Sequence, residues 1–91
     1  MRIVNDTIEL KSTPENYFKE RDNLKCNTVR RFDKWSEMRE FEQFRMEFDH
    51  KIRNKKIKIL GYTFEEFERT ITDITQFEGY WIISWQDTRV I

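Results

Sequence analysis

The chain has 91 residues with 17 basic and 17 acidic side chains, so its formal net charge is zero. This balance excludes the strongly basic domain that binds nucleic acid by charge alone, and also the high net charge of a disordered chain. The length predicts one domain, residues 1–91. Eight Phe, three Trp and three Tyr predict an aromatic core, because each buried ring removes a large apolar area from water.

The number of cysteines and the length of the apolar runs indicate in which cellular compartment the protein is expected. Cys26 is the only cysteine, so an intramolecular disulfide is excluded and nothing indicates an oxidising environment. The segment Met1–Asp6 lacks the apolar region of a signal peptide, and the longest apolar run, Tyr80–Ile83, is too short to span a bilayer. We therefore expect a cytoplasmic protein without membrane association.

The first predicted elements are a strand and a helix. Thr7–Lys11 alternates polar and apolar residues, which predicts a half-buried strand. A helix is expected to begin directly after it, by one of two capping arrangements. Either Ser12 is the N-cap and Glu15 completes a capping box, or Thr13 is the N-cap and Pro14 takes the first helical position.

This helix is expected to run to Arg21 or Asp22. Asn23 is a plausible stop, because Asn tolerates the left-handed conformation better than most residues. The side chains expected to be buried are Tyr17, Phe18 and the aliphatic stem of Arg21. A second strand is predicted over Asn27–Phe32.

The longest helical pattern covers Asp33–Asn54, with Ser36 as the predicted N-cap. Apolar positions recur at spacings of three and four. They are Met38, Phe41, Phe44 or Arg45, Phe48 and Ile52.

Lys55–Leu60 returns to alternation and predicts a third strand, with Ile57 and Ile59 facing inward. It belongs to a basic stretch, His50–Ile59, that contains five basic and no acidic residues. Two interpretations stay open for its lysines. They block edge-to-edge pairing on an edge strand, or they contact phosphate.

The pattern of Thr63–Thr75 is mixed, because helical spacing of Phe and Ile overlaps a run of β-branched residues. We expect a turn or a short helical turn over Thr63–Phe67 and a strand over Glu68–Thr75. A turn at Glu78–Gly79 then leads into Tyr80–Trp85, which is apolar on both faces and is expected to lie centrally in a sheet. Trp81, Ile83 and Trp85 share one side of it.

Together these elements predict an α+β fold, with a small, curved, mostly antiparallel sheet or open β-barrel and two packed helices. Trp81 and Trp85 have the residue type that stacks on bases, but packing in the core is the favoured interpretation on so apolar a strand.

Several chemistries lack their residues. Gly61 and Gly79 are the only glycines, so neither a P-loop nor a dinucleotide-binding turn is expected. His50 and Cys26 are single, and a zinc site needs three or four nitrogen or sulfur ligands. No metal or cofactor is therefore expected. Carboxylates are numerous, but nothing in the sequence selects a catalytic pair.

One short constellation indicates binding chemistry: Lys25, Thr28 and Arg30, followed by Arg31. On a strand, Thr28 and Arg30 share one side, and we expect them to face outward with Val29 in the core. An ammonium, a hydroxyl and a guanidinium are suited to a phosphate or a base edge. The alternative is an ordinary polar strand face with ion pairs to Asp22 or Asp33.

These residues also carry a resemblance. The order of strand, capped helix, Lys-x-x-Thr-x-Arg and a final aromatic strand resembles the ASCH branch of the PUA-like superfamily, in particular small phage-encoded proteins of that type. The segments that carry it are Ile8–Lys11, Pro14–Glu15, Lys25–Arg30, Arg69–Asp73 and Ile82–Trp85.

The resemblance implies a small β-barrel with a cleft for RNA or a modified nucleotide. Some compact bacterial members are amidohydrolases that act on an acetylated cytidine through a Lys, a Thr and a downstream Glu. Lys25 and Thr28 match the first two. For the third, Glu65, Glu66 and Glu78 are unassigned candidates.

Three functions follow as hypotheses. The first is a binding module for RNA or a nucleotide, through Lys25, Thr28, Arg30 and Arg31. Its auxiliary basic residues are Lys55, Lys56 and Lys58. The second is a phage-encoded inhibitor of a host defence protein or enzyme, in which the acidic helix Ser36–Asp49 mimics a phosphate surface. The third is a small amidohydrolase, and no catalytic residue is assigned for it.

Overall fold

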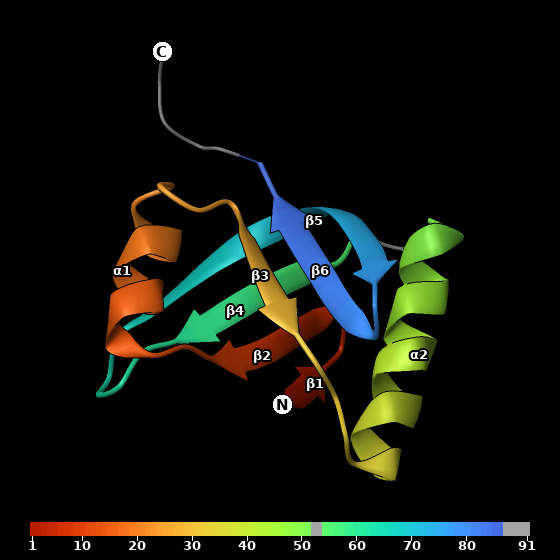
Figure 1. Cartoon of the computed structure of the whole chain (residues 1–91). Helices are drawn as coiled ribbons and strands as arrows, with labels where there is room; N and C mark the ends of the chain where they lie inside the picture. Colours follow the sequence, from red (N-terminus) through yellow and green to blue (C-terminus); the bar gives the residue numbers. More distant parts are fainter. Residues whose placement is uncertain (52–53, 87–91) are drawn as a thin grey trace.

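More of the described residues lie in strands than in helices. The computed structural model describes residues 1–51 and 54–86, and in this part of the chain six strands form one sheet and two helices pack against it (Figure 1). The elements are β1 (Arg2–Val4), β2 (Thr7–Lys11), α1 (Pro14–Arg21), β3 (Asn27–Arg30), α2 (Trp35–Asp49), β4 (Lys56–Leu60), β5 (Glu66–Phe77) and β6 (Tyr80–Trp85). The expected α+β class with a mostly antiparallel open sheet is confirmed.

The sheet has the order β1-β2-β4-β5-β6-β3, and among the described strands only the β2–β4 pair is parallel. The long strand β5 joins its two halves, because it pairs with β4 up to Thr70 and with β6 from Ile71 onward. A register shift between Ile71 and Asp73 marks an irregularity of the kind that bends a strand. The sheet therefore curls, and β3 and β6 lie in front of β2 and β4 in Figure 1.

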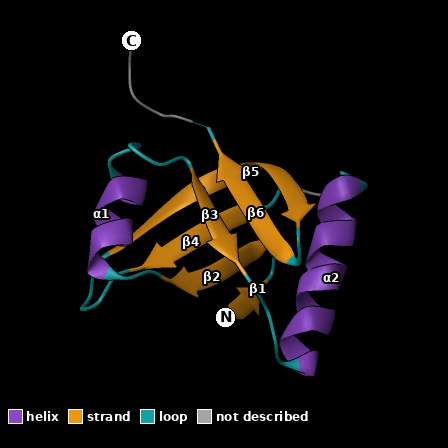
Figure 2. Cartoon of the chain, in the orientation of Figure 1, coloured by secondary structure: helices purple, strands orange, loops and turns teal. Residues whose placement is uncertain are grey.

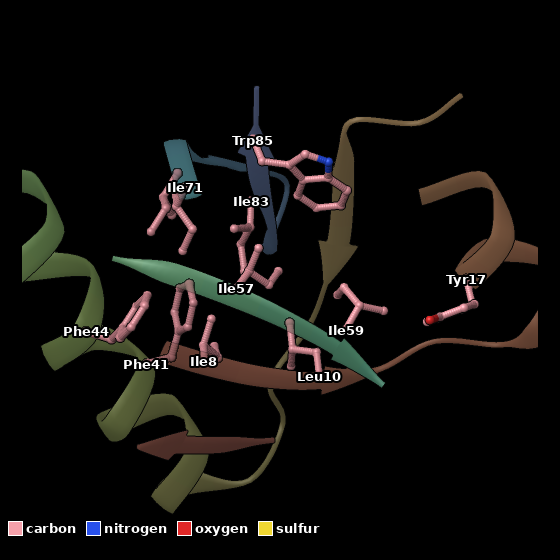
Figure 3. Packing of buried hydrophobic residues seen from close by; sticks show 11 residues of the cluster. Ile8, Leu10, Tyr17, Phe41, Phe44, Ile57, Ile59, Ile71, Ile83 and Trp85 are labelled. Carbon is pink, nitrogen blue, oxygen red and sulfur yellow. The ribbon is translucent and has the colours of Figure 1, made fainter. Parts of the chain in front are cut away.

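The core fills the inside of this curl. Figure 3 shows Phe41 and Phe44 entering from α2 at one end and Tyr17 lying at the α1 end. Figure 2 shows the two helices at opposite ends of the sheet. The inward strand residues between them are Ile8, Leu10, Ile57, Ile59, Ile71, Ile74, Ile83 and Trp85, all buried. Apolar burial of this kind is the main favourable term in folding.

Helix α1 begins as one of the two capping arrangements predicts. Thr13 is the N-cap, its side chain accepts a hydrogen bond from the Asn16 amide, and Pro14 follows it. Asn23 adopts a φ of 62°, as expected for a left-handed stop. The predicted buried side is wrong in part: Tyr17 is buried, but Phe18 is 44% exposed and Glu20 is buried in its place.

Helix α2 covers less of the chain than the expected Asp33–Asn54. Lys34, not Ser36, is its N-cap, and no side chain caps it. Phe41 and Phe44 are buried as the spacing predicts, whereas Met38 is 46% exposed. The position expected for Ile52 lies outside the described residues.

Strand β1 and the start of β5 differ from the prediction, because both depend on pairing with another strand rather than on the local sequence pattern. Strand β1 was not predicted, and it pairs with β2 through a turn in which Asn5 has a φ of 56°. Of the turn or short helical turn expected over Thr63–Phe67, the helical alternative is wrong: the chain bends at residues 62–64, the Gly61 amide donates to the carbonyl oxygen of Glu65 at 2.7 Å, and β5 begins at Glu66, opposite Leu60 of β4. Phe64, which the helical spacing would bury, is fully exposed.

Strand β6 matches its prediction. It lies between β5 and β3, its Ile83 and Trp85 are buried, and Trp81 packs on Phe41 with ring centroids 5.1 Å apart. The two tryptophans thus belong to the core rather than to a stacking surface. Strand β4 lies between β2 and β5, so the interpretation of its lysines as protection of an edge strand is wrong.

Replacing Phe41 tests the aromatic core. Its ring contacts Phe32, Phe44 and Trp81, so we expect Phe41→Ala to lower the free energy of unfolding by about 3–5 kcal/mol. The control is Met38→Ala on the exposed part of the same helix, for which about 1 kcal/mol or less is expected. Urea unfolding followed by tryptophan fluorescence measures both. Equal losses in the two variants would contradict the packing described here.

Candidate functional site

A pocket of about 170 Å³ lies where α1, the end of β2 and β3 meet. The residues that line it are Lys11, Ser12, Thr13, Asn16, Glu20, Lys25, Thr28, Val29 and Arg30. All three members of the Lys-x-x-Thr-x-Arg constellation are therefore in one concave site. Among the described residues, Glu20 contributes the carboxylate that lines this pocket.

The Arg30 side chain fixes the shape of this pocket. Its Nε donates to Thr28 Oγ1 at 2.9 Å, its Nη1 to the carbonyl oxygen of Lys11 at 2.6 Å, and its Nη2 to Ser12 Oγ at 2.8 Å. Among the described residues, β1 pairs with β2 from Thr7 to Glu9 and not with the last two residues of β2. The bonds from Arg30 connect β3 to this unpaired end of β2. Burial lowers the pKa of the Arg30 guanidinium, and the negative charge of Glu20 opposes that shift.

Glu20 is fully buried on α1 and completes a chain of polar contacts. The Ser12 hydroxyl donates to Glu20 Oε1 at 2.6 Å, and the same hydroxyl oxygen accepts from Arg30. Glu20 Oε2 is also buried, and it has no hydrogen-bond partner in residues 1–51 and 54–86. A buried acceptor without a donor costs on the order of 1–3 kcal/mol, and more when it is charged. A residue that lines this pocket thus carries a buried acceptor without a donor among the described residues.

Strand β3 presents the opposite face from the one expected. Thr28 is 2% exposed and Val29 is 47% exposed, so Thr28 faces inward and Val29 outward. The register explains this, because Thr28 lies directly opposite the buried Ile83 of β6, and opposed residues share a face. Arg30 therefore enters the pocket from inside the curled sheet.

Lys25 reaches the pocket from the turn after α1. The left-handed Asn23 ends the helix, and the amides of Leu24 and Lys25 both donate to the carbonyl oxygen of Lys19. The Lys25 side chain is half-buried, and its ammonium makes no hydrogen bond or ion pair with any described residue. It therefore supplies a positive charge that is available to a ligand.

Arg31 is not brought to this pocket. It is exposed, and its Nε donates to Asp33 Oδ1 at 2.9 Å, which is one of the ion pairs that the sequence left open. Asp33 also raises the pKa of the Arg31 guanidinium. Arg31 lines a separate hollow of about 410 Å³ with Phe32 and Trp81.

The auxiliary lysines do not form a basic surface. Lys55 is 2% exposed, and its Nζ contacts Glu47 Oε1 at 2.6 Å and Asp6 Oδ1 at 2.9 Å. Burial opposes its charge, but the hydrogen bonds to these two carboxylates outweigh it and raise the pKa of the Lys55 amine. On the outer face of β4, Lys56 lies 3.7 Å from Glu68.

Lys58 lies directly opposite Glu9 on one neighbouring strand and Glu68 on the other. Cross-strand pairs of opposite charge stabilise a sheet. Lys56 and Lys58 of the basic stretch thus lie beside acidic residues of β2 and β5.

None of the three glutamates considered as a third catalytic group lines the pocket; these are Glu65, Glu66 and Glu78. Among the described residues, Glu20 is the glutamate that lines it. One signal in the sequence was available: Asn16 and Glu20 are four residues apart and follow the cap Thr13, so they share a helix face. Glu20 was not predicted as a site residue, because a glutamate in a charged helix is usually exposed.

The acidic helix presents fewer open carboxylates than its sequence suggests. Of the four glutamates Glu37, Glu40, Glu42 and Glu47, three have cationic partners within the described residues. Glu37 contacts the N-terminal ammonium, Glu42 contacts Arg45, and Glu47 contacts Lys55. These three carboxylates of α2 are therefore paired with cations.

Residues 1–51 and 54–86 contain no group of three or more His, Cys, Asp or Glu side chains placed to hold a metal ion. In the same residues, no helix has the length and apolar character needed to cross a bilayer. Comparison with family models, curated proteins and solved structures gives no match to this chain. The resemblance to ASCH proteins therefore rests on the motifs alone.

Lys55 and its two carboxylates provide a test of structural charge pairing. Lys55→Ala removes a buried ammonium and leaves two carboxylates that are 30% and 35% exposed, so we expect it to lower the free energy of unfolding by roughly 1.5–3 kcal/mol at pH 7, the range for hydrogen bonds to charged groups. The exposed neighbour provides the control: Lys56→Ala is expected to change stability by about 0.5 kcal/mol or less.

The contact between Lys55 and Glu47 predicts that the free energy of unfolding depends on pH. Hydrogen bonds from Lys55 and Gln43 lower the pKa of Glu47 from its ordinary value of 4.5. The stability that this carboxylate contributes is therefore complete above about pH 4.5 and is lost as the pH falls through the lowered pKa of the folded state. Urea unfolding between pH 7 and 3 is expected to show a smaller loss in Lys55→Ala than in the wild type. Parallel curves would contradict this assignment.

Proposed function

We propose that this chain is a small ASCH-like binding module that takes a nucleotide, free or within RNA, into the pocket formed by Glu20, Lys25, Thr28 and Arg30. One observation carries the proposal. A fully buried carboxylate with an unsatisfied oxygen lies in the same pocket as a half-buried guanidinium. Nucleobases offer donors and acceptors side by side on one edge, which is the complement of such a pair.

The size of the pocket determines which part of a nucleotide it holds. A volume of about 170 Å³ is below the roughly 300–1,000 Å³ of pockets that enclose drug-sized ligands. It suits a base and leaves ribose and phosphate outside. Lys25 and the exposed Lys11 also line the pocket and supply positive charge for a phosphate.

The resemblance supports the same site. Lys25 and Thr28, the two positions that match the family motif, line one pocket, and the curved open sheet is compatible with a PUA-like architecture. No aromatic residue is among the described residues that line the pocket, so hydrogen bonds and charge carry the binding rather than stacking.

Binding assays test this proposal. Fluorescence polarisation with short single-stranded RNA and DNA, and calorimetry with nucleotides, are expected to show binding at low salt. One or two phosphate contacts predict a slope of log affinity against log salt of about −1. Lys25→Ala is expected to weaken nucleotide binding about tenfold.

Arg31→Ala is the matched control, because Arg31 is a nearby arginine outside the pocket and is paired with Asp33. It is expected to leave affinity unchanged. Absence of binding to every nucleic acid and nucleotide at low salt would refute the proposed function. An equal effect of both variants would refute this pocket as its site.

Hydrolysis is a second candidate, because the structure places Glu20 in the pocket that Lys25 and Thr28 also line. In this candidate mechanism Glu20, rather than Glu65, Glu66 or Glu78, acts as the carboxylate. Chromatography of acetylated cytidine after incubation with the protein is expected to show release of cytidine, lost in Lys25→Ala. Turnover that persists in this variant would exclude the mechanism. Inhibition of a host protein through α2 has less support, since three of its four glutamates considered above are paired within the described chain.

A further inference from the structure

We propose that the outer face of strands β3, β6 and β5 binds a second copy of this chain around a twofold axis. This inference is independent of the proposed function and begins from a pattern in β6. Tyr80–Trp85 is apolar on both faces, which is typical of a strand that is covered on both sides. Trp81, Ile83 and Trp85 pack in the core, but no described helix lies over the other face in Figure 1.

The pairing register defines this outer face. Ile74 and Ile83 are buried and lie opposite each other, so the residues next to them in the sequence point outward. On β3, the buried Thr28 places Val29 on the outer side by the same alternation. Arg31 follows β3 and lies beside Tyr80, with its guanidinium 6.0 Å from the ring centroid. In three rows across the strands β5, β6 and β3, the outer face consists of Asp73, Ser84 and Asn27, then Thr75, Ile82 and Val29, then Phe77, Tyr80 and Arg31.

Most of the side chains in the second and third rows are apolar or aromatic. Val29 is 47%, Tyr80 45% and Phe77 66% exposed, and Ile82 is half-buried at the centre of the face. A contiguous exposed apolar patch marks an interaction site, whereas single exposed apolar residues do not. β-branched and aromatic side chains of this kind fill the layer between two packed sheets. The outer face is therefore suited to packing against another sheet.

The charges of the face indicate which partner covers it. Charged residues make up 37% of the chain, but the face itself has one acidic residue, Asp73, and one basic residue, Arg31. They occupy diagonally opposite corners. A twofold rotation can therefore place Asp73 of each copy opposite Arg31 of the other, which makes the face complementary to itself. Nucleic acids and anionic membranes are less suited, because Arg31 is already paired with Asp33 and the face has no excess of positive charge.

This charge pairing also determines how the two copies are oriented. The axis that exchanges the two corners lies oblique to the strands, so the strands of the two copies cross roughly at right angles. Orthogonal packing is one of the two preferred geometries of stacked sheets. The formal net charge of the chain is zero, so no long-range repulsion opposes the approach of a second copy.

The size of the face predicts a weak dimer. Strand β6 has six residues and is about 20 Å long, and three strands span roughly 10–15 Å. The face thus has a projected area of roughly 200–300 Å², whereas stable complexes bury about 800 Å² on each partner. We expect a transient dimer with a dissociation constant between about 10 μM and 1 mM.

Sedimentation velocity at protein concentrations from about 10 μM to 1 mM tests this inference. The sedimentation coefficient of the wild type is expected to rise with concentration towards that of a dimer. Ile82→Lys and Thr75→Lys place an ammonium in the middle row of the face, and each is expected to weaken association at least about tenfold. Thr75 is exposed, so Thr75→Lys keeps the test decisive even if Ile82→Lys does not fold.

Phe64→Lys is the matched control, because Phe64 is a fully exposed apolar residue of the loop between β4 and β5 and lies outside the face. It is expected to associate as the wild type does. A wild type that remains monomeric at about 1 mM overturns the inference. Unchanged association of Thr75→Lys, or loss of association in Phe64→Lys alone, overturns it as well.

A charge exchange tests the twofold arrangement. Asp73→Arg and Arg31→Asp each bring like charges together across the axis, so each is expected to raise the dissociation constant of the dimer about threefold. The double variant restores unlike pairs and is expected to return the dissociation constant to the wild-type value. No recovery in the double variant overturns the proposed arrangement of the two copies.

Discussion

Both the fold and the pocket depend on the hydrogen bonds that the Arg30 guanidinium donates to Thr28, Lys11 and Ser12. The curled sheet is open between its end strands, and Arg30 spans part of this opening by joining β3 to the end of β2 and to Ser12. Backbone pairing would close a complete barrel at this point. Here a side chain takes its place, and the space around that side chain is the pocket. Burial of the guanidinium is unfavourable, and the carboxylate of Glu20 offsets part of that cost.

Two buried charge clusters show how similar chemistry serves different ends. Around Lys55, two carboxylates meet one ammonium, and these contacts tie the β1–β2 turn and α2 to the start of β4. Around Glu20, the carboxylate has a donor on one oxygen and none on the other within the described chain. A cluster with matched partners stabilises the fold, whereas one with an unmatched acceptor is the better candidate for a ligand.

The sequence predicted those features that depend on neighbouring residues. Alternation located β2 and β4, a strand apolar on both faces located β6, and the start of α1 follows one of the two capping arrangements considered, Thr13 with Pro14. It could not predict which face of β3 is buried, because that follows from the register of Thr28 against Ile83, more than fifty residues along the chain. Glu20 was missed because a glutamate in a charged helix is usually exposed. The groups that interact with its buried carboxylate, Ser12 and Arg30, lie outside α1.

The position of β3 in the sheet has a consequence for folding during synthesis. Every residue that lines the pocket lies between positions 11 and 30, yet within the described residues β3 pairs with β6, near the other end of the chain. Contacts between such distant segments form slowly, because a long loop must close first. The residues of the pocket are therefore synthesised well before β6, the strand that pairs with β3, so we expect the pocket to form only after most of the chain has left the ribosome.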